Sequence, residues 1–135
     1  MQIEQFDTGL KIKKNIEDVE ITPIQNLNNK KFVIENFRNI YGLKKINLKK
    51  NLLNIFDKDI KVNCFEPLNE FNGIDNFIEK FWNPLFDAFP DIERRENIIL
   101  GGSFRDKVQV GSYSTLSGFF LKPWLGIKPN FKMIN

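Results

Sequence analysis

Apolar side chains recur at helical spacing in three parts of the chain. From about Asn28, the apolar residues at positions 32, 33, 37 and 40 follow a helical repeat, which Tyr41-Gly42 is predicted to stop. A shorter repeat of the same kind covers residues 47–56. The strongest repeat runs from Ile74 to Phe89, with large apolar side chains at spacings of three and four. We therefore predict three helices, the last of them kinked at Pro84, which lacks the backbone donor of a helical residue.

Alternation of apolar and polar residues predicts the strands. Residues 60–64 alternate in this way, which is typical of a half-buried strand. Residues 92–100 and 107–116 are predicted to form two antiparallel strands, connected through Gly101-Gly102 and through Arg105-Asp106. The long hairpin formed in this way would dominate the sheet.

The remaining segments set the domain organisation. Residues 66–73 and 117–130 are rich in turn-forming residues and predict loops, and residues 131–135 have the pattern of half a further strand. Residues 1–27 are interpreted as a polar N-terminal arm, and residues 28–135 as one domain. Because the helices precede a run of antiparallel strands, we predict an α+β fold with the helices on one face of a curved sheet.

Composition narrows the chemistry. A chain of 135 residues, 41% of them hydrophobic, can bury a core without disulfide or metal staples. The single cysteine, Cys64, excludes an internal disulfide and any CxxC metal site. Histidine is absent, which excludes histidine-containing triads and histidine-ligated metal sites. A carboxylate, tyrosine or lysine is left for any acid–base step, and we expect neither a metal nor a cofactor.

Charge and hydropathy point away from nucleic acid and membrane. The net charge is +3, and a lysine cluster at positions 44, 45, 49 and 50 is interpreted as a solvated helix face. Arginine, the better fork for a phosphate group, occurs only four times. The chain has no secretory signal pattern and no long apolar stretch. We expect a cytoplasmic protein with no nucleic-acid and no membrane partner.

One run of residues resembles a known family. The segment from Phe81 to Arg95, FWNPLFDAFPDIERR, is similar to the SnoaL-like branch of the nuclear transport factor 2-like superfamily. Further similar pieces are Gly73, Gly101-Gly102, Gly111-Ser112-Tyr113 and the run PWLGIKP at residues 123–129. The resemblance implies a cone, in which helices pack on a strongly curved antiparallel sheet around an apolar pocket. It also implies a homodimer packed through the sheet.

Two departures from the family pattern bear on catalysis. The chain ends before the last strands of the family, so we expect the domain at residues 28–135 to lack them, and with them the acid–base aspartate of the polyketide cyclases. The strand position that carries histidine in relatives is Ser112, whose hydroxyl is no base near neutral pH without a helper.

Three functional hypotheses stay open on these grounds, because one fold hosts many functions. The first is a domain that binds a small apolar or polyketide-like ligand and, as a divergent cyclase, has little activity of its own. The second is a cofactor-independent cyclase or isomerase that abstracts a proton next to a carbonyl. The third is a non-catalytic interaction module, in which strand pairing with a partner completes an open sheet edge.

Glu66 is the candidate base for the second hypothesis. Glu66-Pro67 follows the first predicted strand, where ketosteroid isomerase relatives place a proton-abstracting aspartate before a proline. Apolar surroundings disfavour an ionised carboxylate and make it a stronger base, and Tyr41 or Ser112 are candidates to hold the enolate.

The expected pocket wall comes from the aromatic helix and the long hairpin. Each aromatic residue of this wall could instead simply fill the hydrophobic core. Tyr113 is predicted to face outward, because its strand parity is opposite to that of Ser112. Asp91 is expected to accept backbone hydrogen bonds at the helix-to-strand turn, and Arg94 and Arg95 to lie on the sheet surface or pair with nearby glutamates. The pocket residues are Phe65, Trp82, Phe86, Phe89, Ser112, Tyr113 and Trp124.

Overall fold

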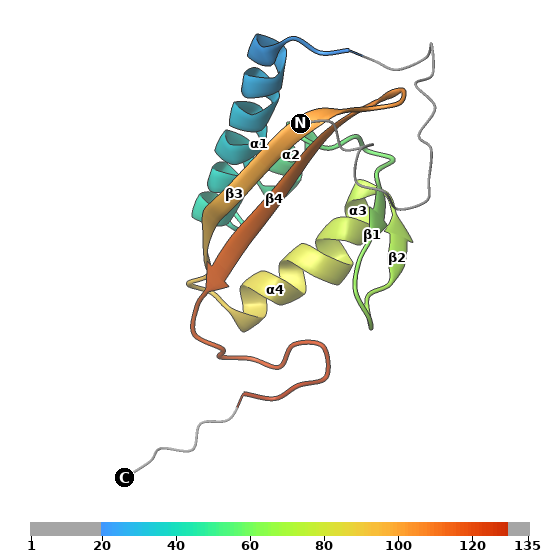
Figure 1. Cartoon of the computed structure of the whole chain (residues 1–135). Coiled ribbons are helices and arrows are strands. Elements are labelled where there is room, and N and C mark those ends of the chain that lie inside the picture. Colours follow the sequence, from blue (N-terminus) through green and yellow to red (C-terminus); the bar gives the residue numbers. More distant parts are fainter. Residues whose placement is uncertain (1–19, 130–135) are drawn as a thin grey trace, which may run out of the picture.

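The structure, a computed structural model, describes residues 20–129 and has the predicted α+β class (Figure 1). The predicted strand at 131–135 and most of the predicted arm, residues 1–19, lie outside the described residues. In chain order the elements are α1 (Pro23–Leu43), α2 (Leu48–Leu53), β1 (Lys61–Asn63), β2 (Glu70–Asn72), α3 (Ile74–Phe77), the π-helix η2 (Ile78–Trp82), α4 (Asn83–Ala88), β3 (Glu93–Phe104) and β4 (Lys107–Ser117).

Helix α1 begins at Pro23 rather than near Asn28, so its first turn lies within the segment interpreted as an arm. A capping box fixes this start: the Thr22 hydroxyl accepts from the Gln25 N–H at 3.1 Å, and the Gln25 side chain accepts from the Thr22 N–H at 2.9 Å. Pro23 occupies the first helical position, where a missing N–H costs nothing. The apolar repeat could not indicate this turn, because Pro23, Ile24 and Gln25 are exposed and Asn26 is polar.

The irregularity expected at Pro84 takes the form of a π turn. Segments α3, η2 and α4 follow one another without a break, and the Asn83 N–H bonds to the Ile78 carbonyl, five residues back. Pro84 has no N–H, and its ring would crowd the carbonyl four residues earlier in a regular helix. The wider π turn directly before Pro84 relieves that crowding.

The long hairpin forms as predicted, with a longer first strand. β3 pairs with β4 in antiparallel register, for example Arg94 with Leu116 and Gly101 with Val110, so Gly101-Gly102 belong to β3 and not to the connection. The turn consists of Arg105 and Asp106, and Arg105 takes a positive φ of 57°. A bulge lies between Glu96 and Ile98.

The predicted loop at residues 66–73 contains β2, which pairs with β1 so that Val62 lies opposite Phe71. Three residues with one buried side chain, Phe71, are too few to show alternation. The described residues therefore form two separate two-stranded sheets, neither of them strongly curled, in place of the single curved sheet predicted. After β4 the chain runs to the end of α4, where the Leu121 N–H donates to the Ala88 carbonyl at 2.8 Å, instead of adding a strand to the hairpin.

The core lies between the helices rather than on the sheet. Trp82, only 2% exposed, packs edge-on against Tyr41 with ring centroids 5.5 Å apart and is tilted against Phe86 at 5.6 Å. Figure 1 shows α1 along one side of the β3–β4 ribbon and the helix formed by α3, η2 and α4 on the other side of the ribbon in this view. No helix in the described part of the chain is long and apolar enough to span a membrane. The buried core residues are Ile40, Tyr41, Leu48, Leu52, Phe71, Ile74, Phe77, Trp82, Leu85, Phe86 and Ile92.

Candidate ligand-binding site

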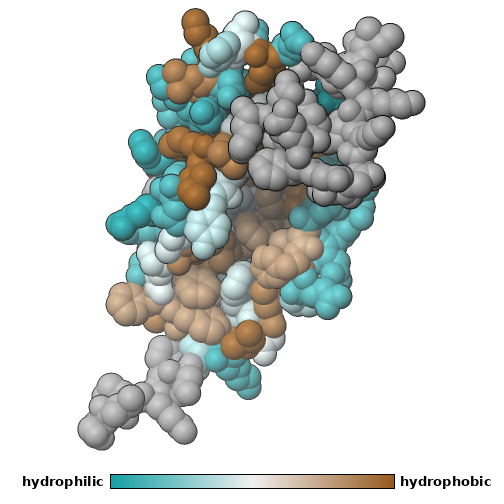
Figure 2. All heavy atoms as spheres, viewed as in Figure 1, coloured by the Kyte–Doolittle hydropathy of each residue, from teal (hydrophilic) through white to brown (hydrophobic). Residues whose placement is uncertain are grey.

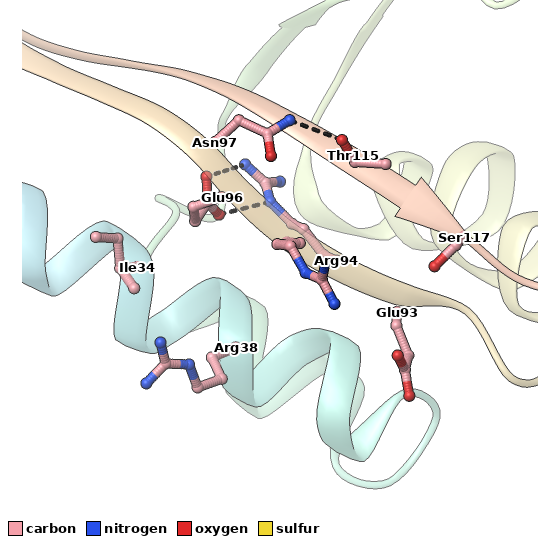
Figure 3. Close-up of a pocket in the computed structure, with 9 residues that line it drawn as sticks. Ile34, Arg38, Glu93, Arg94, Glu96, Asn97, Thr115 and Ser117 are labelled. Atoms are coloured by element: carbon pink, nitrogen blue, oxygen red, sulfur yellow. Dashed lines mark hydrogen bonds and ion pairs between the residues drawn. The ribbon is translucent and has the colours of Figure 1, made fainter.

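A hollow of about 730 Å³ lies where α1 approaches the first half of β3 (Figure 3). Side chains from α1 and from both strands of the ribbon surround it, and most of them are polar or charged. Its lining residues are Ile34, Arg38, Glu93, Arg94, Arg95, Glu96, Asn97, Thr115 and Ser117.

Among the described lining residues of the hollow, Arg94 makes the most side-chain interactions. Its Nε donates to Glu96 Oε1 at 2.7 Å, and its Nη2 donates to Ser112 Oγ at 2.7 Å. Arg94 and Glu96 lie two residues apart on β3 and therefore share a face, and their side chains are only 13% and 19% exposed. An ion pair shielded to this degree holds its geometry better than a fully exposed one.

Aromatic rings of α1 cover the same guanidinium group. Arg94 lies over the Phe37 ring, 4.2 Å from its centroid, and 5.7 Å from that of Tyr41, one helical turn further on. Burial raises the pKa of the Tyr41 phenol, and the positive charge of Arg94 partly opposes that rise. Tyr41 therefore stays protonated at neutral pH and keeps a hydroxyl donor beside Arg94.

The approach of α1 to β3 depends on Gly101. A Cβ at this position would lie 2.3 Å from Asn26 Oδ1 and 3.0 Å from Lys30 Cγ, both on α1. Any larger residue would push the helix away from the strand or displace these side chains. At the bulge itself, Asn97 Nδ2 donates to Thr115 Oγ1 at 2.7 Å, which ties the two strands together at the hollow.

This arrangement suits the binding of a carbonyl compound. Arg94 contributes a guanidinium group to the lining, and Asn97, Thr115 and Ser117 contribute an amide and two hydroxyl groups. Ser112, Phe37 and Tyr41 contact Arg94 but are not lining residues. Ile34 offers apolar contact area. Within residues 20–129, no three histidine, cysteine or acidic side chains gather in a way that could hold a metal ion.

The aromatic residues expected to line one pocket separate into two groups. Trp82 and Phe86 are buried in the helical core, which corresponds to the alternative that they fill the core instead of lining a pocket. Phe89 instead stacks on Phe120, with ring centroids 5.0 Å apart, and contacts Trp124 edge-on at 5.6 Å. Phe65, which is half exposed, meets the other side of this second group, 6.5 Å from Trp124.

The structure places three other candidate residues in different environments: Ser112, Tyr113 and Glu66. Ser112 faces α1 and bonds to Arg94, whereas Tyr113 points outward and is exposed, as its strand parity predicts. Glu66 lies on the exposed turn between β1 and β2, bonded to Pro67 through a cis peptide. The candidate enolate partners Tyr41 and Ser112 gather around Arg94, between α1 and the ribbon.

The importance of Arg94 was not predicted, although its pairing with a nearby glutamate was. A signal was present in the sequence: Arg94 and Glu96 share the strand parity of Ile92, an apolar residue that is buried in the structure. Asp91 accepts a backbone hydrogen bond as expected, but its donor is the Phe119 N–H at 2.8 Å, from the segment after β4. The Gly118 backbone lies close by, since a Cβ there would meet Ile92 Cα at 3.1 Å.

Comparison of the chain with protein-family models, with curated proteins and with solved structures gives no match. The function is therefore argued from the residues and the geometry of this hollow.

Proposed function

We propose that the chain is a SnoaL-like domain of the nuclear transport factor 2-like type, which binds a small aromatic or polyketide-like carbonyl compound in the hollow between α1 and the β3–β4 ribbon. The order of elements supports this proposal, because helices, two short paired strands, an aromatic helix and a long hairpin follow one another. Strands that pair with the free edges of the ribbon would extend and bend it into the cone.

The observation that carries the proposal is the fixed guanidinium group of Arg94. Glu96 and Ser112 hold it, Phe37 covers it, and it lies in the wall of a hollow large enough for a fused-ring compound. A guanidinium group fixed in this way can donate to the carbonyl oxygen of a ligand, and Ile34 offers apolar contact beside it. The proposal assigns binding and no reaction, because Glu66 lies on an exposed turn.

Acetylnaphthalene, a neutral aromatic ketone, is a suitable probe for calorimetric titration. The wild-type chain should bind it saturably, and Arg94→Met/Glu96→Leu should bind at least about tenfold more weakly, as expected from the loss of one hydrogen bond to a charged donor. The matched control is Lys61→Met/Glu70→Leu, which removes an exposed ion pair of 3.2 Å on the β1–β2 sheet. Equal affinity in all three proteins would contradict the proposed site.

The outward face of the ribbon favours a second function, self-association. Large apolar side chains of β3 and β4 are exposed on one face of the ribbon, where Ile98 pairs with Tyr113. Figure 2 shows several apolar side chains at the surface of the part of the molecule that is not grey. We propose that a second copy of the chain covers this face, as in homodimers packed through the sheet. Light scattering should give twice the chain mass of 15.9 kDa, and Leu100→Lys should give a monomer. A monomeric wild-type chain would contradict this proposal. The exposed fractions are 56% for Ile98, 68% for Leu100, 49% for Phe104 and 69% for Tyr113.

A further inference from the structure

Arginine is concentrated at the hollow. The chain has twenty basic residues, of which only four are arginine, and three of these, Arg38, Arg94 and Arg95, line the hollow. None of the lysines in the described part of the chain lines it, although lysine is by far the commoner basic residue of the chain. Arginine differs from lysine in presenting a planar fork of donors that matches a carboxylate group. The basic side chains that the described residues contribute to the hollow are therefore all arginines, the type suited to a carboxylate.

Two of these guanidinium groups are free to act on a ligand. The charge of Arg94 is matched by Glu96 in a 2.7 Å contact. Neither Arg38 nor Arg95 forms an ion pair with any residue of the described range 20–129. Among residues 20–129 the lining has one other acidic residue, Glu93, so its described side chains carry a net charge of +1, from three arginines and two glutamates.

We propose that the natural ligand carries a carboxylate group, which Arg38 and Arg95 bind at the hollow while its ring system packs toward Ile34 and Arg94. One carboxylate balances the surplus charge of +1, whereas a phosphate monoester would bring more negative charge than the lining can match. This inference rests on the proposed function, since it names the class of ligand for the same hollow.

Naphthoate and naphthamide test the inference, because they have the same shape and differ in charge. At low ionic strength the wild-type chain should bind naphthoate about tenfold more tightly, the factor that corresponds to one net charge-assisted hydrogen bond. The variant Arg38→Gln/Arg95→Gln should lose this preference, because its affinity for naphthoate should fall to the level of its affinity for naphthamide. The matched control Lys58→Gln/Lys80→Gln removes the same charge from exposed positions outside the hollow and should keep the preference.

The outcomes separate the inference from the proposed function. Equal binding of naphthoate and naphthamide by the wild-type chain would overturn the inference and leave the binding of a carbonyl compound standing. A preference that survives in the arginine variant, or that disappears equally in the lysine control, would overturn it as well. Failure of both compounds to bind, together with failure of acetylnaphthalene, would overturn the inference and the proposed function.

Discussion

Replacement of Arg94 by methionine should destabilise the fold far more than the loss of an ordinary surface ion pair. The substitution keeps much of the aliphatic side chain and removes the 2.7 Å bonds to Glu96 and Ser112 together with the contact over Phe37. A hydrogen bond to a charged group contributes about 1.5–3 kcal/mol, and a stranded carboxylate adds a desolvation cost. Because Glu96 is 19% exposed, water relieves part of that cost. We expect a loss of about 3 kcal/mol, somewhat below the usual cost of breaking a fully buried pair.

Urea unfolding followed by tryptophan fluorescence measures this loss, since Trp82 lies in the core. A loss of about 3 kcal/mol lowers the ratio of folded to unfolded chain by a factor of roughly 100. The double variant Arg94→Met/Glu96→Leu removes both charges and should return to within about 1 kcal/mol of the wild-type value. The exposed pair variant Lys61→Met/Glu70→Leu should change stability by about 1 kcal/mol at most. The reasoning is refuted if Arg94→Met is neutral, or if the double variant is as unstable as the single one.

Three further predictions concern the core, the titration of Tyr41 and the segment after β4. Trp82→Ala should cost about 3–5 kcal/mol in urea unfolding, whereas Phe119→Ala, at an exposed position, should cost less than about 0.5 kcal/mol; similar costs for both would argue against the helical core. The raised pKa of Tyr41 means that the folded state keeps the phenol proton longer than the unfolded state. The free energy of unfolding should therefore fall as pH rises through and above the ordinary tyrosine range, and Tyr41→Phe, unlike Tyr113→Phe, should make that fall shallower. Asp91→Ala removes the acceptor of the Phe119 N–H and should cost about 1 kcal/mol, with hydrogen exchange at that amide becoming faster; unchanged exchange would contradict the contact.

The helices were predictable because residues that face one core recur at the helical repeat. That repeat indicates α2, most of α1 and the segment from Ile74 to Ala88. It cannot indicate the first turn of α1, which is fixed by polar capping at Thr22 and Gln25. The strand parity of β4 was equally readable, since it placed Ser112 and Tyr113 on opposite faces.

The arrangement of the sheets was not predictable in the same way. Alternation tells which face of a strand is buried, but the identity of the neighbouring strand depends on where the connecting segments pack. Here β1 pairs with the three-residue β2, and the segment after β4 is held at α4 by Leu121 and Asp91. The β1–β2 pairing is local, but β2 is too short to show alternation. The contacts of Leu121 and Asp91 join residues far apart in sequence, so a local pattern gives no sign of them.

The sequence predicts only part of the candidate site. Pairing of Arg94 with Glu96 follows from their spacing on a strand, whereas the cover of Phe37 and Tyr41 depends on the close packing of α1 against β3. That packing requires the absence of a side chain at Gly101, which no periodic pattern reveals. Trp82 and Phe86 look the same in the sequence whether they line a pocket or fill a core.

The central claim is that the hollow beside Arg94 binds an aromatic carbonyl compound. Proton–nitrogen correlation NMR during titration with acetylnaphthalene tests it most directly, because each backbone amide reports its own surroundings. The account predicts saturable shifts that cluster at residues 34–41 of α1 and 93–97 of β3, and their loss in Arg94→Met/Glu96→Leu. No saturable shift, or shifts centred on Phe65 and Trp124 instead, would contradict it.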